Sequence, residues 1–221
     1  MGESATALRR LDEITRRLRT ECPWDREQDE RSIVPHTVEE AYELADAAYA
    51  GDDAKLLDEL GDVLFQVYFL SLLMEERGAG DLAAVADHCR TKLIRRHPHV
   101  FGDVEAADAS EVLRNWDEIK RTEEGRGGEL FAGLPETLPG LLYASKVLRR
   151  GGSDQRADKL RSEADRAAAH AASESHPDAR FEAVGDLLLA AVALARELRV
   201  DPELAVRAAA DRFRGEREAE A

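Results

Sequence analysis

The sequence predicts an all-α protein, and three observations support this fold class. Ala and Leu are abundant, whereas aromatic residues make up only 5% of the 221 residues and runs of Val, Ile and Tyr are scarce. These preferences favour helices over strands. Apolar residues also recur at helical spacing in several segments. With a hydrophobic content of 43%, the chain is long enough to form one or two compact domains of packed helices.

The N-terminal segment predicts the first amphipathic helix. Between Leu8 and Leu18 the apolar residues lie three or four positions apart, as on one face of a helix. Ser4 is a plausible cap, and Pro23 is expected to end the helix. We expect a short loop over residues 21–25 to follow.

Two long helices are expected next. The second should cover residues 37–50, because Gly51-Asp52-Asp53 then breaks the helical pattern. The third should run over residues 54–77. Its middle, residues 63–74, is apolar nearly all round, which is typical of a helix buried on most sides. We therefore expect this segment to form the centre of the core.

Two shorter helices complete the first half of the chain. Asp81 can cap a fourth helix that reaches about His97. Residues 98–103 contain Pro and Gly and are expected to form a loop. A fifth helix is expected over residues 110–123.

Charge and composition exclude several classes of protein. The net charge of −15 argues against a nucleic-acid scaffold or a membrane-surface protein, because both need a basic face. No stretch approaches the length of a membrane span, and four arginines interrupt the N-terminal apolar residues, so no signal peptide is indicated. Cys22 and Cys89 are far apart and suggest neither a disulfide framework nor a zinc site. We expect a cytoplasmic protein with no membrane or nucleic-acid polymer as partner.

Two pairs of acidic residues carry the chemical signal of the sequence. Glu40 and Glu43 are three residues apart on the second helix, and Glu59 and Asp62 have the same spacing on the third. Each pair therefore presents two carboxylates from one helix face. If the two helices are antiparallel, all four acids converge. Such a cluster repels itself unless a hard cation such as Mg²⁺, which favours oxygen ligands, lies between the carboxylates. The pattern predicts a metal site.

Other roles for these acids remain open at this point. Thr37-Val38-Glu39-Glu40 also fits a capping box, in which Glu40 would only satisfy the first amides of a helix. Helical acids often form no more than a solvated face. Gly61, between Glu59 and Asp62, costs about 1 kcal/mol of helix propensity relative to Ala, which a close approach of a neighbouring helix or a ligand would explain.

Two rival functions compete with a phosphate-binding metal site. A ferritin-like di-iron protein also gathers carboxylates in a helical bundle, but it needs Glu-x-x-His motifs, and this chain contains none. A non-catalytic helical interaction module is the second alternative. Metal titration separates it from an enzyme, because an interaction module should gain no stability from Mg²⁺.

The second half of the chain is similar in sequence to the first. Residues 125–140 contain Gly125-Arg126-Gly127-Gly128 and several prolines, which indicates a linker. Beyond it, residues 185–190 resemble residues 61–66, and the 22-residue separation of Glu40 and Asp62 becomes 23 residues in the second copy. We interpret this as an internal duplication. Its acidic set is broken, since the four positions read Glu163, Arg166, Ala183 and Asp186.

This echo gives the predicted domain organisation. Residues 1–124 should form a catalytic helical module, residues 125–140 a linker, and residues 141–221 a degenerate copy of the module. Two acids rarely hold a metal cluster, so we expect the second copy to serve in packing, dimerisation or regulation.

Four strings of residues, taken in order, resemble the MazG family of nucleoside triphosphate pyrophosphohydrolases. They are Cys22-Pro23-Trp24-Asp25, Glu39-Glu40-Ala41-Tyr42-Glu43, Glu59-Leu60-Gly61-Asp62-Val63-Leu64-Phe65-Gln66 and Arg95-Arg96-His97-Pro98-His99-Val100-Phe101. The resemblance covers about residues 5–124. It implies the all-α NTP pyrophosphatase fold, a homodimer, and Mg²⁺, with Mn²⁺ as a substitute, held by Glu40, Glu43, Glu59 and Asp62. Longer members of the family have two modules, whereas here the second acidic set is broken.

The resemblance also implies a reaction, namely hydrolysis of a nucleoside triphosphate at the α–β bond to a monophosphate and pyrophosphate. Either broad specificity or housecleaning of non-standard nucleotides is expected. Glu39, beside the ligand set, is the candidate for orienting or deprotonating the attacking water. The candidate substrate contacts are Lys92, Arg95 and Arg96 for phosphate oxygens, Lys120 for the same role, and Trp116 or Trp24 for stacking on the base. Each tryptophan has a structural alternative as a core or loop anchor.

Overall fold

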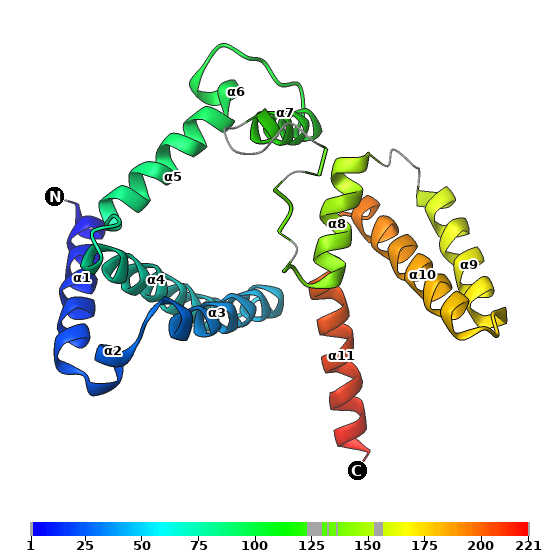
Figure 1. Cartoon of the computed structure of the whole chain (residues 1–221), viewed down its shortest axis with the longest axis horizontal. Helices are drawn as coiled ribbons and strands as arrows, with labels where there is room; N and C mark the ends of the chain where they lie inside the picture. Colours follow the sequence, from blue (N-terminus) through cyan, green and yellow to red (C-terminus); the bar gives the residue numbers. More distant parts are fainter. Residues whose placement is uncertain (1, 123–129, 132, 136, 153–156, 221) are drawn as a thin grey trace. The chain divides into compact units, whose positions relative to one another are not determined.

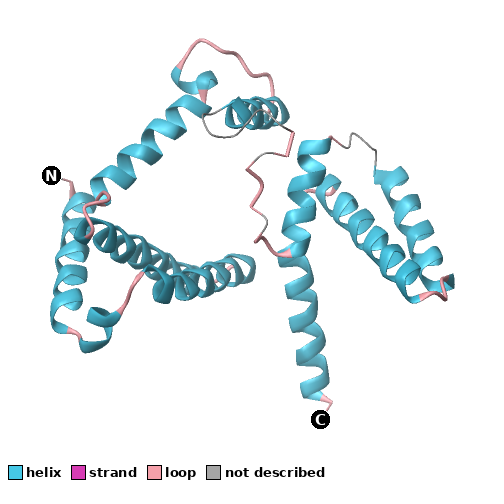
Figure 2. Cartoon of the chain, viewed as in Figure 1, coloured by secondary structure: helices cyan, strands magenta, loops and turns pink. Residues whose placement is uncertain are grey.

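The computed structural model describes residues 2–122, 130–131, 133–135, 137–152 and 157–220. Within these residues every regular element is an α-helix (Figures 1 and 2), so the predicted all-α class is confirmed. The chain divides into two compact units, Met1–Val104 and Glu105–Ala221. None of the described helices combines the length and the apolar character that crossing a membrane requires.

The first unit is built around a hairpin of two long helices. Its helices are α1 (Glu3–Glu21), α2 (Pro23–Glu27), α3 (Glu30–Ala50), α4 (Asp53–Glu76), α5 (Leu82–Arg96) and α6 (Pro98–Phe101). Helices α3 and α4 pack along each other and are joined by Gly51 and Asp52 (Figure 1). Gly51 has a φ of 68°, in the left-handed region that favours glycine, and Asp52 caps α4 by accepting from the amides of Ala54 and Lys55. This tight turn makes the two helices antiparallel.

Helix α3 begins at Glu30, seven residues before the predicted start at residue 37. Asp29 caps it, because its side chain accepts from the amides of Arg31 and Ser32 at 2.9 Å and its own amide donates to Ser32 Oγ. The helix then continues through Pro35. The predicted start was wrong, since a strong capping box outweighs the hydrogen bond that Pro35 cannot donate. Thr37 therefore lies inside the helix.

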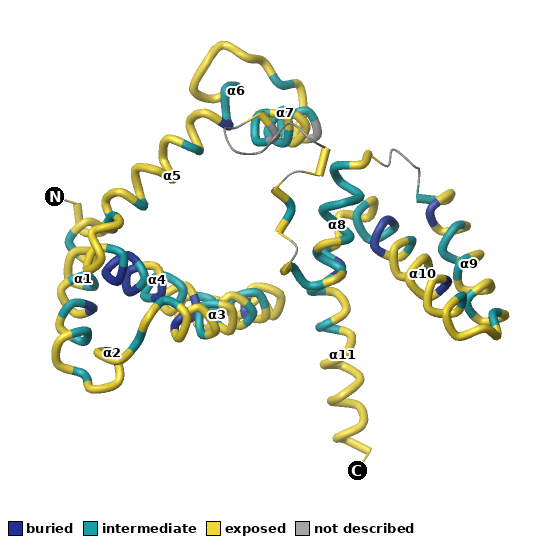
Figure 3. Tube along the Cα trace, in the orientation of Figure 1, coloured by how far each residue is buried: buried dark blue, intermediate teal, exposed yellow. Residues whose placement is uncertain are grey.

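The core of the first unit lies where α1 and α3 cover the C-terminal half of α4. Ile33, Phe69 and Leu73 form a buried cluster, and Phe65 and Leu70 pack against it. Figure 3 shows the buried positions gathered along this part of α4. The expectation that residues 63–74 form the centre of the core is confirmed, because the buried residues of α4 other than Glu59 lie within this segment. The N-terminal half of α4 is much more exposed, which leaves room for a site there.

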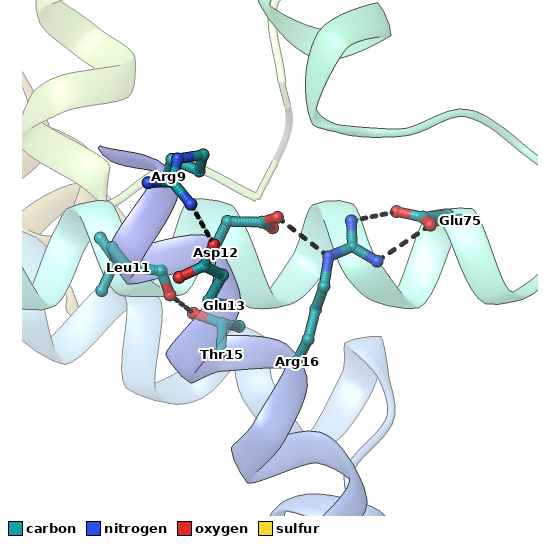
Figure 4. Close-up of polar contacts among 7 residues, drawn as sticks. All are labelled: Arg9, Leu11, Asp12, Glu13, Thr15, Arg16 and Glu75. Atoms are coloured by element: carbon teal, nitrogen blue, oxygen red, sulfur yellow. Dashed lines mark hydrogen bonds and ion pairs between the residues drawn. The ribbon is translucent and has the colours of Figure 1, made fainter. Parts of the chain in front are cut away.

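Ion pairs join α1 to the end of α4. Arg16 donates from Nη1 and Nη2 to the two carboxylate oxygens of Glu75, at 3.0 and 2.6 Å, and from Nε to Asp12 at 3.0 Å (Figure 4). Thr15, which is almost fully buried, donates to the Leu11 carbonyl on the same helix. Bidentate arginine–carboxylate pairs are among the stronger polar contacts, so α1 is held to the hairpin at one end.

The second unit repeats the hairpin. Its described helices are α7 (Ala109–Thr122), α8 (Gly140–Gly151), α9 (Ala157–Ser173), α10 (Pro177–Glu197) and α11 (Pro202–Ala219). Helices α9 and α10 pack along each other as α3 and α4 do, with Leu160, Ala183 and Val192 buried, and α10 also contacts α8 and α11. The interpretation of this half as an internal duplication stays a prediction.

The predicted domain boundaries remain predictions. Residues 125–129 of the expected linker lie outside the described residues. Helix α7 is part of the second compact unit, whereas the sequence pattern assigns it to the first module.

Candidate metal centre

The α3–α4 hairpin brings three of the four predicted acids together. Glu40 and Glu43 come from α3 and Glu59 comes from α4, and one carboxylate oxygen of each lies within 4.8 Å of the other two. This geometry follows from the turn at Gly51, because Glu43 lies eight residues before it and Glu59 eight residues after it. In an antiparallel pair, positions at equal distances from the turn lie side by side.

Asp62 lies close to this group without belonging to it. It is exposed and one helical turn beyond Glu59. After burial, the charge of Asp62 is the largest cause of the raised pKa of Glu40, and it also contributes to the raised pKa of Glu59. The fourth predicted ligand is therefore near enough to interact electrostatically with Glu40 and Glu59.

Burial differs among the three clustered carboxylates. Glu59 is only 4% exposed, Glu40 is half-buried and Glu43 is exposed. Burial is the largest cause of the raised pKa of Glu40 and Glu59, and the charges of the neighbouring acids raise both further. The negative charge of the cluster is therefore poorly solvated at Glu59, whereas the cluster is open to solvent at Glu43. A cation bound at the open side would relieve this repulsion.

The donor set fits a hard divalent cation. All three clustered groups offer carboxylate oxygen, and the grouping of possible ligands in the described part of the chain contains no His or Cys. Mg²⁺ and Mn²⁺ prefer such oxygen ligands, whereas zinc and copper sites normally use nitrogen or sulfur. The geometry also removes the capping alternative for Glu40, because α3 starts at Glu30.

Lys55 is a neighbour that the sequence pattern had not singled out. Its Nζ lies 3.9 Å from Glu59 Oε1. Burial and the neighbouring acids raise the pKa of Glu59, and the charge of Lys55 opposes this increase. The signal was present in the sequence, since a lysine four residues before an acid lies on the same helix face.

Glu39 and Gly61 differ from their predicted surroundings. Glu39 is exposed, and its Oε2 lies 3.6 Å from Nδ1 of His36 rather than among the clustered oxygens. A Cβ added to Gly61 would meet nothing within 4 Å. The expected close approach of a neighbouring helix at Gly61 was therefore wrong within one chain, because this flank of α4 faces outward.

Trp24 contacts His36 on α3. The edge of its ring meets His36, with centroids 5.8 Å apart and planes at 66°. His36 is one turn before Glu40 on the same face of α3, a rise of about 6 Å. Trp24 is 51% exposed, so a large part of its ring is open to a ligand.

The predicted basic contacts on α5 do not reach the acids within one chain. Lys92 shares a cavity with Met74, at the C-terminal end of α4. Met74 is twelve residues beyond Asp62, a helical rise of about 18 Å. Arg95 is exposed and Arg96 is buried near the end of the same helix. Helix α5 follows the C-terminal end of α4 after residues 77–81, and Lys92 remains next to that end.

Trp116 and Lys120 belong to the second unit. They lie on α7, where Nζ of Lys120 is 5.5 Å from the centre of the Trp116 ring. Their role as substrate contacts stays a prediction.

The matching positions of the second hairpin hold no carboxylate cluster in the part of the chain that the structure describes. Ala183, in the place of Glu59, is buried at 2% exposure. Arg166, in the place of Glu43, donates from Nε to the carbonyl of Ser162 on its own helix at 3.2 Å. The second unit therefore lacks the buried acid around which the first cluster is built.

Comparisons with known proteins identify the family of this chain. Residues 28–101 match the MazG nucleotide pyrophosphohydrolase domain. Over 218 residues the chain is 39% identical to the nucleoside triphosphate pyrophosphohydrolase of Escherichia coli (strain K12), covering 92% of this chain and 83% of that protein. The chain belongs to the MazG family. It is therefore related to hydrolases that act on phosphoric anhydrides, as the resemblance of its motifs implies.

A second relative also matches over both units. The nucleoside triphosphate pyrophosphohydrolase/pyrophosphatase MazG of Thermotoga maritima is 34% identical over 220 residues, which cover 96% of this chain and 85% of that protein. A solved MazG-related protein from Thermotoga maritima covers 51% of this chain and 98% of its own, at 26% identity and a TM-score of 0.45. All four predicted ligands lie within the matched MazG domain, whereas Trp24 lies just outside it.

Proposed function

We propose that the first unit hydrolyses nucleoside triphosphates at the α–β bond, giving a nucleoside monophosphate and pyrophosphate, with Mg²⁺ held by Glu40, Glu43, Glu59 and Asp62. The observation that carries this proposal is the convergence of three carboxylate oxygens within 4.8 Å on one hairpin. Membership of the MazG family supplies the substrate class. Mn²⁺ is the expected substitute, because it accepts the same oxygen ligands.

The residues of the site have different proposed roles in this reaction. A bound divalent cation supplies charge neutralisation of the phosphate oxygens and a bound water of lowered pKa. Glu59, which is buried, fixes the position of the ligand set, while Glu43 and Asp62 stand at the open side where a triphosphate can approach. Lys55, 3.9 Å from Glu59, is placed to offset further negative charge.

Glu39 is our candidate for orienting the attacking water. Its Oε2 lies 3.6 Å from Nδ1 of His36, which is beyond hydrogen-bond length. The arrangement suits a group that acts on the water from the edge of the site without being a metal ligand.

Trp24 is our candidate for the base contact. Its half-exposed ring contacts His36. On α3, His36 is about one helical turn from Glu40. A base stacked there would leave its triphosphate free to reach the carboxylates. Every base presents a π-face, so stacking alone discriminates little among them. We therefore propose broad specificity, with housecleaning of non-standard nucleotides as the narrower alternative.

A homodimer is part of the proposal. The α3–α4 hairpin leaves Val38, Leu57 and Leu60 about half exposed or more, with Leu57 at 74%. A second hairpin packed on this surface would bury these residues in a helical bundle. A second copy could also bring its α5 arginines to acids that they do not reach within one chain.

One assay tests the reaction. Purified protein is incubated with a panel of nucleoside triphosphates and Mg²⁺, and pyrophosphate is distinguished from orthophosphate. Glu43→Gln and Asp62→Asn should abolish pyrophosphate release, whereas Asp87→Asn, which removes an exposed carboxylate on α5 paired with Arg90 at 3.0 Å, should not. Orthophosphate as the product, or full activity of Glu43→Gln, would overturn the mechanism.

A further inference from the structure

The second unit contains a cavity of about 270 Å³ between α7 and α8. Its lining residues are Arg114, Asp117, Glu118, Leu130, Arg149 and Arg150. Of these described residues, three carry a guanidinium group and two carry a carboxylate. The proposed metal ligands are on α3 and α4, and none of them lines this cavity.

Arg149 has hydrogen-bonding capacity left over inside this cavity. Its Nη2 lies 3.1 Å from Oδ1 of Asp117. Its Nε, by contrast, is buried and has no acceptor among the described residues. Buried N–H groups normally find a partner, because leaving one unpaired loses the hydrogen bond it made with water. The unpaired donor therefore indicates a missing acceptor beside Arg149.

Arg196 adds a second cation to the same neighbourhood. It donates to the carbonyl of Ser145, a neutral acceptor, rather than to a carboxylate. Burial lowers its pKa, the charge of Arg149 lowers it further, and Asp117 opposes both effects. Two guanidinium groups thus share the charge of one carboxylate. Arg114, on the cavity wall, forms no ion pair with the described residues.

We propose that this cavity binds a compact phosphate-type anion, inorganic phosphate or pyrophosphate, with Arg149 as the central ligand and Arg114 beside it. The planar guanidinium group matches two oxygens of such an anion, and an anionic oxygen is the acceptor that Arg149 Nε lacks. The size of the cavity also favours a small ion, since pockets for drug-sized ligands usually measure about 300–1,000 Å³.

The test measures anion binding with EDTA present, so that the acidic cluster has no cation through which to bind phosphate. Trp116, next to Asp117 on α7, reports binding by its fluorescence in a Trp24→Phe background, where it is the remaining tryptophan. Inorganic phosphate and pyrophosphate are titrated separately. We expect saturable binding of at least one, and at least about tenfold weaker binding in Arg149→Gln. The control is Arg214→Gln, which removes an exposed arginine of the same unit, 3.2 Å from Asp211, and should leave binding unchanged.

Two results would overturn the proposal. One is the absence of saturable binding of either anion up to roughly 10 mM. The other is equal affinity in Arg149→Gln and the wild type. If circular dichroism shows that Arg149→Gln does not fold, Arg114→Gln replaces it, because Arg114 is exposed and holds no ion pair among the described residues. Unchanged affinity in a folded Arg114→Gln would then contradict the assignment.

Discussion

Arg19 donates two hydrogen bonds to Glu76, from Nε to Oε1 and from Nη2 to Oε2, each 2.8 Å long. The same guanidinium also donates to the carbonyl of Gln28 at 3.0 Å and lies 5.8 Å from the centre of the Phe69 ring. One side chain therefore joins α1, the segment after α2, and the end of α4 next to the buried core. Its side chain is only 17% exposed, so these contacts are partly shielded from water.

Replacing Arg19 by Ala should lower the free energy of unfolding of the first unit. Removing a shielded, charge-assisted pair and its packing should cost about 2 kcal/mol. Urea denaturation followed by circular dichroism measures the loss. Arg17→Ala is the matched control, because Arg17 pairs with Glu21 at 2.9 Å on the exposed side of the same helix. Its effect should stay below about 1 kcal/mol, and equal losses in the two variants would contradict this account.

The ion pairs of α1 also predict a dependence of stability on pH. Hydrogen bonding to Arg19 lowers the pKa of Glu76 below its ordinary value of 4.5, and Arg16 lowers that of Glu75. A carboxylate with a lowered pKa in the folded state stabilises the fold fully above its unfolded value and loses this contribution as the pH falls through the folded pKa. The free energy of unfolding should therefore decrease below about pH 4.5. Glu76→Gln should show a shallower decrease in urea titrations across this range, and an unchanged slope would count against the pair.

Glu59→Gln should separate stability from activity. Burial and neighbouring acids raise the pKa of Glu59, so without a cation its charge opposes folding near neutral pH. The substitution should raise the melting temperature of the metal-free protein. It should also remove the additional stabilisation by Mg²⁺ and lower turnover by at least about 100-fold. Thermal melts with EDTA and with Mg²⁺ measure both effects. If Mg²⁺ raised the melting temperature of Glu59→Gln as much as it raises that of the wild type, the cation would bind elsewhere.

Mixing two inactive variants should test whether α5 acts across a dimer. If Arg95 of one copy serves the carboxylates of the other, Glu59→Gln and Arg95→Ala should each be inactive alone. After subunit exchange in an equal mixture, half of the dimers combine both variants and hold one intact site, so activity should recover to about a quarter of the wild-type value. Size-exclusion chromatography confirms the exchange. No recovery after complete exchange would place Arg95 outside the partner's site.

Trp24→Ala should raise KM for every nucleoside triphosphate to a similar extent, by roughly 10-fold or more. The reason is that its exposed ring offers stacking rather than hydrogen bonds that distinguish bases. Trp24→Phe, which keeps an aromatic face, should retain most of the affinity. Steady-state kinetics on adenine, guanine, cytosine and uracil nucleotides provide the comparison. A change in kcat with unchanged KM would instead indicate that Trp24 holds the loop in place.

The parts of this molecule that depend on local spacing were predictable, and those that depend on packing were not. The pairing of Glu40 with Glu43 and the convergence on Glu59 follow from helix periodicity and a two-residue turn. The start of α3 was missed, because the capping box formed by Asp29 and Ser32 was not considered. Chain connectivity places the start of α5 at the C-terminal end of α4, but the direction of α5 beyond residues 77–81 depends on tertiary packing, which no periodic pattern encodes.

The length of the turn between α3 and α4 sets how the two pairs of acids face each other. Glu40 and Asp62 each lie eleven residues from Gly51, and Glu43 and Glu59 each lie eight residues from it. One inserted residue there would rotate one acid pair by about 100° relative to the other, as damaging as deleting a ligand. In the second unit the connection between α9 and α10 has three residues instead of two. Under the proposed function the second hairpin holds no metal, so the length of its turn is not constrained in this way. The length of this turn would then distinguish hairpins that bind a metal from hairpins that do not.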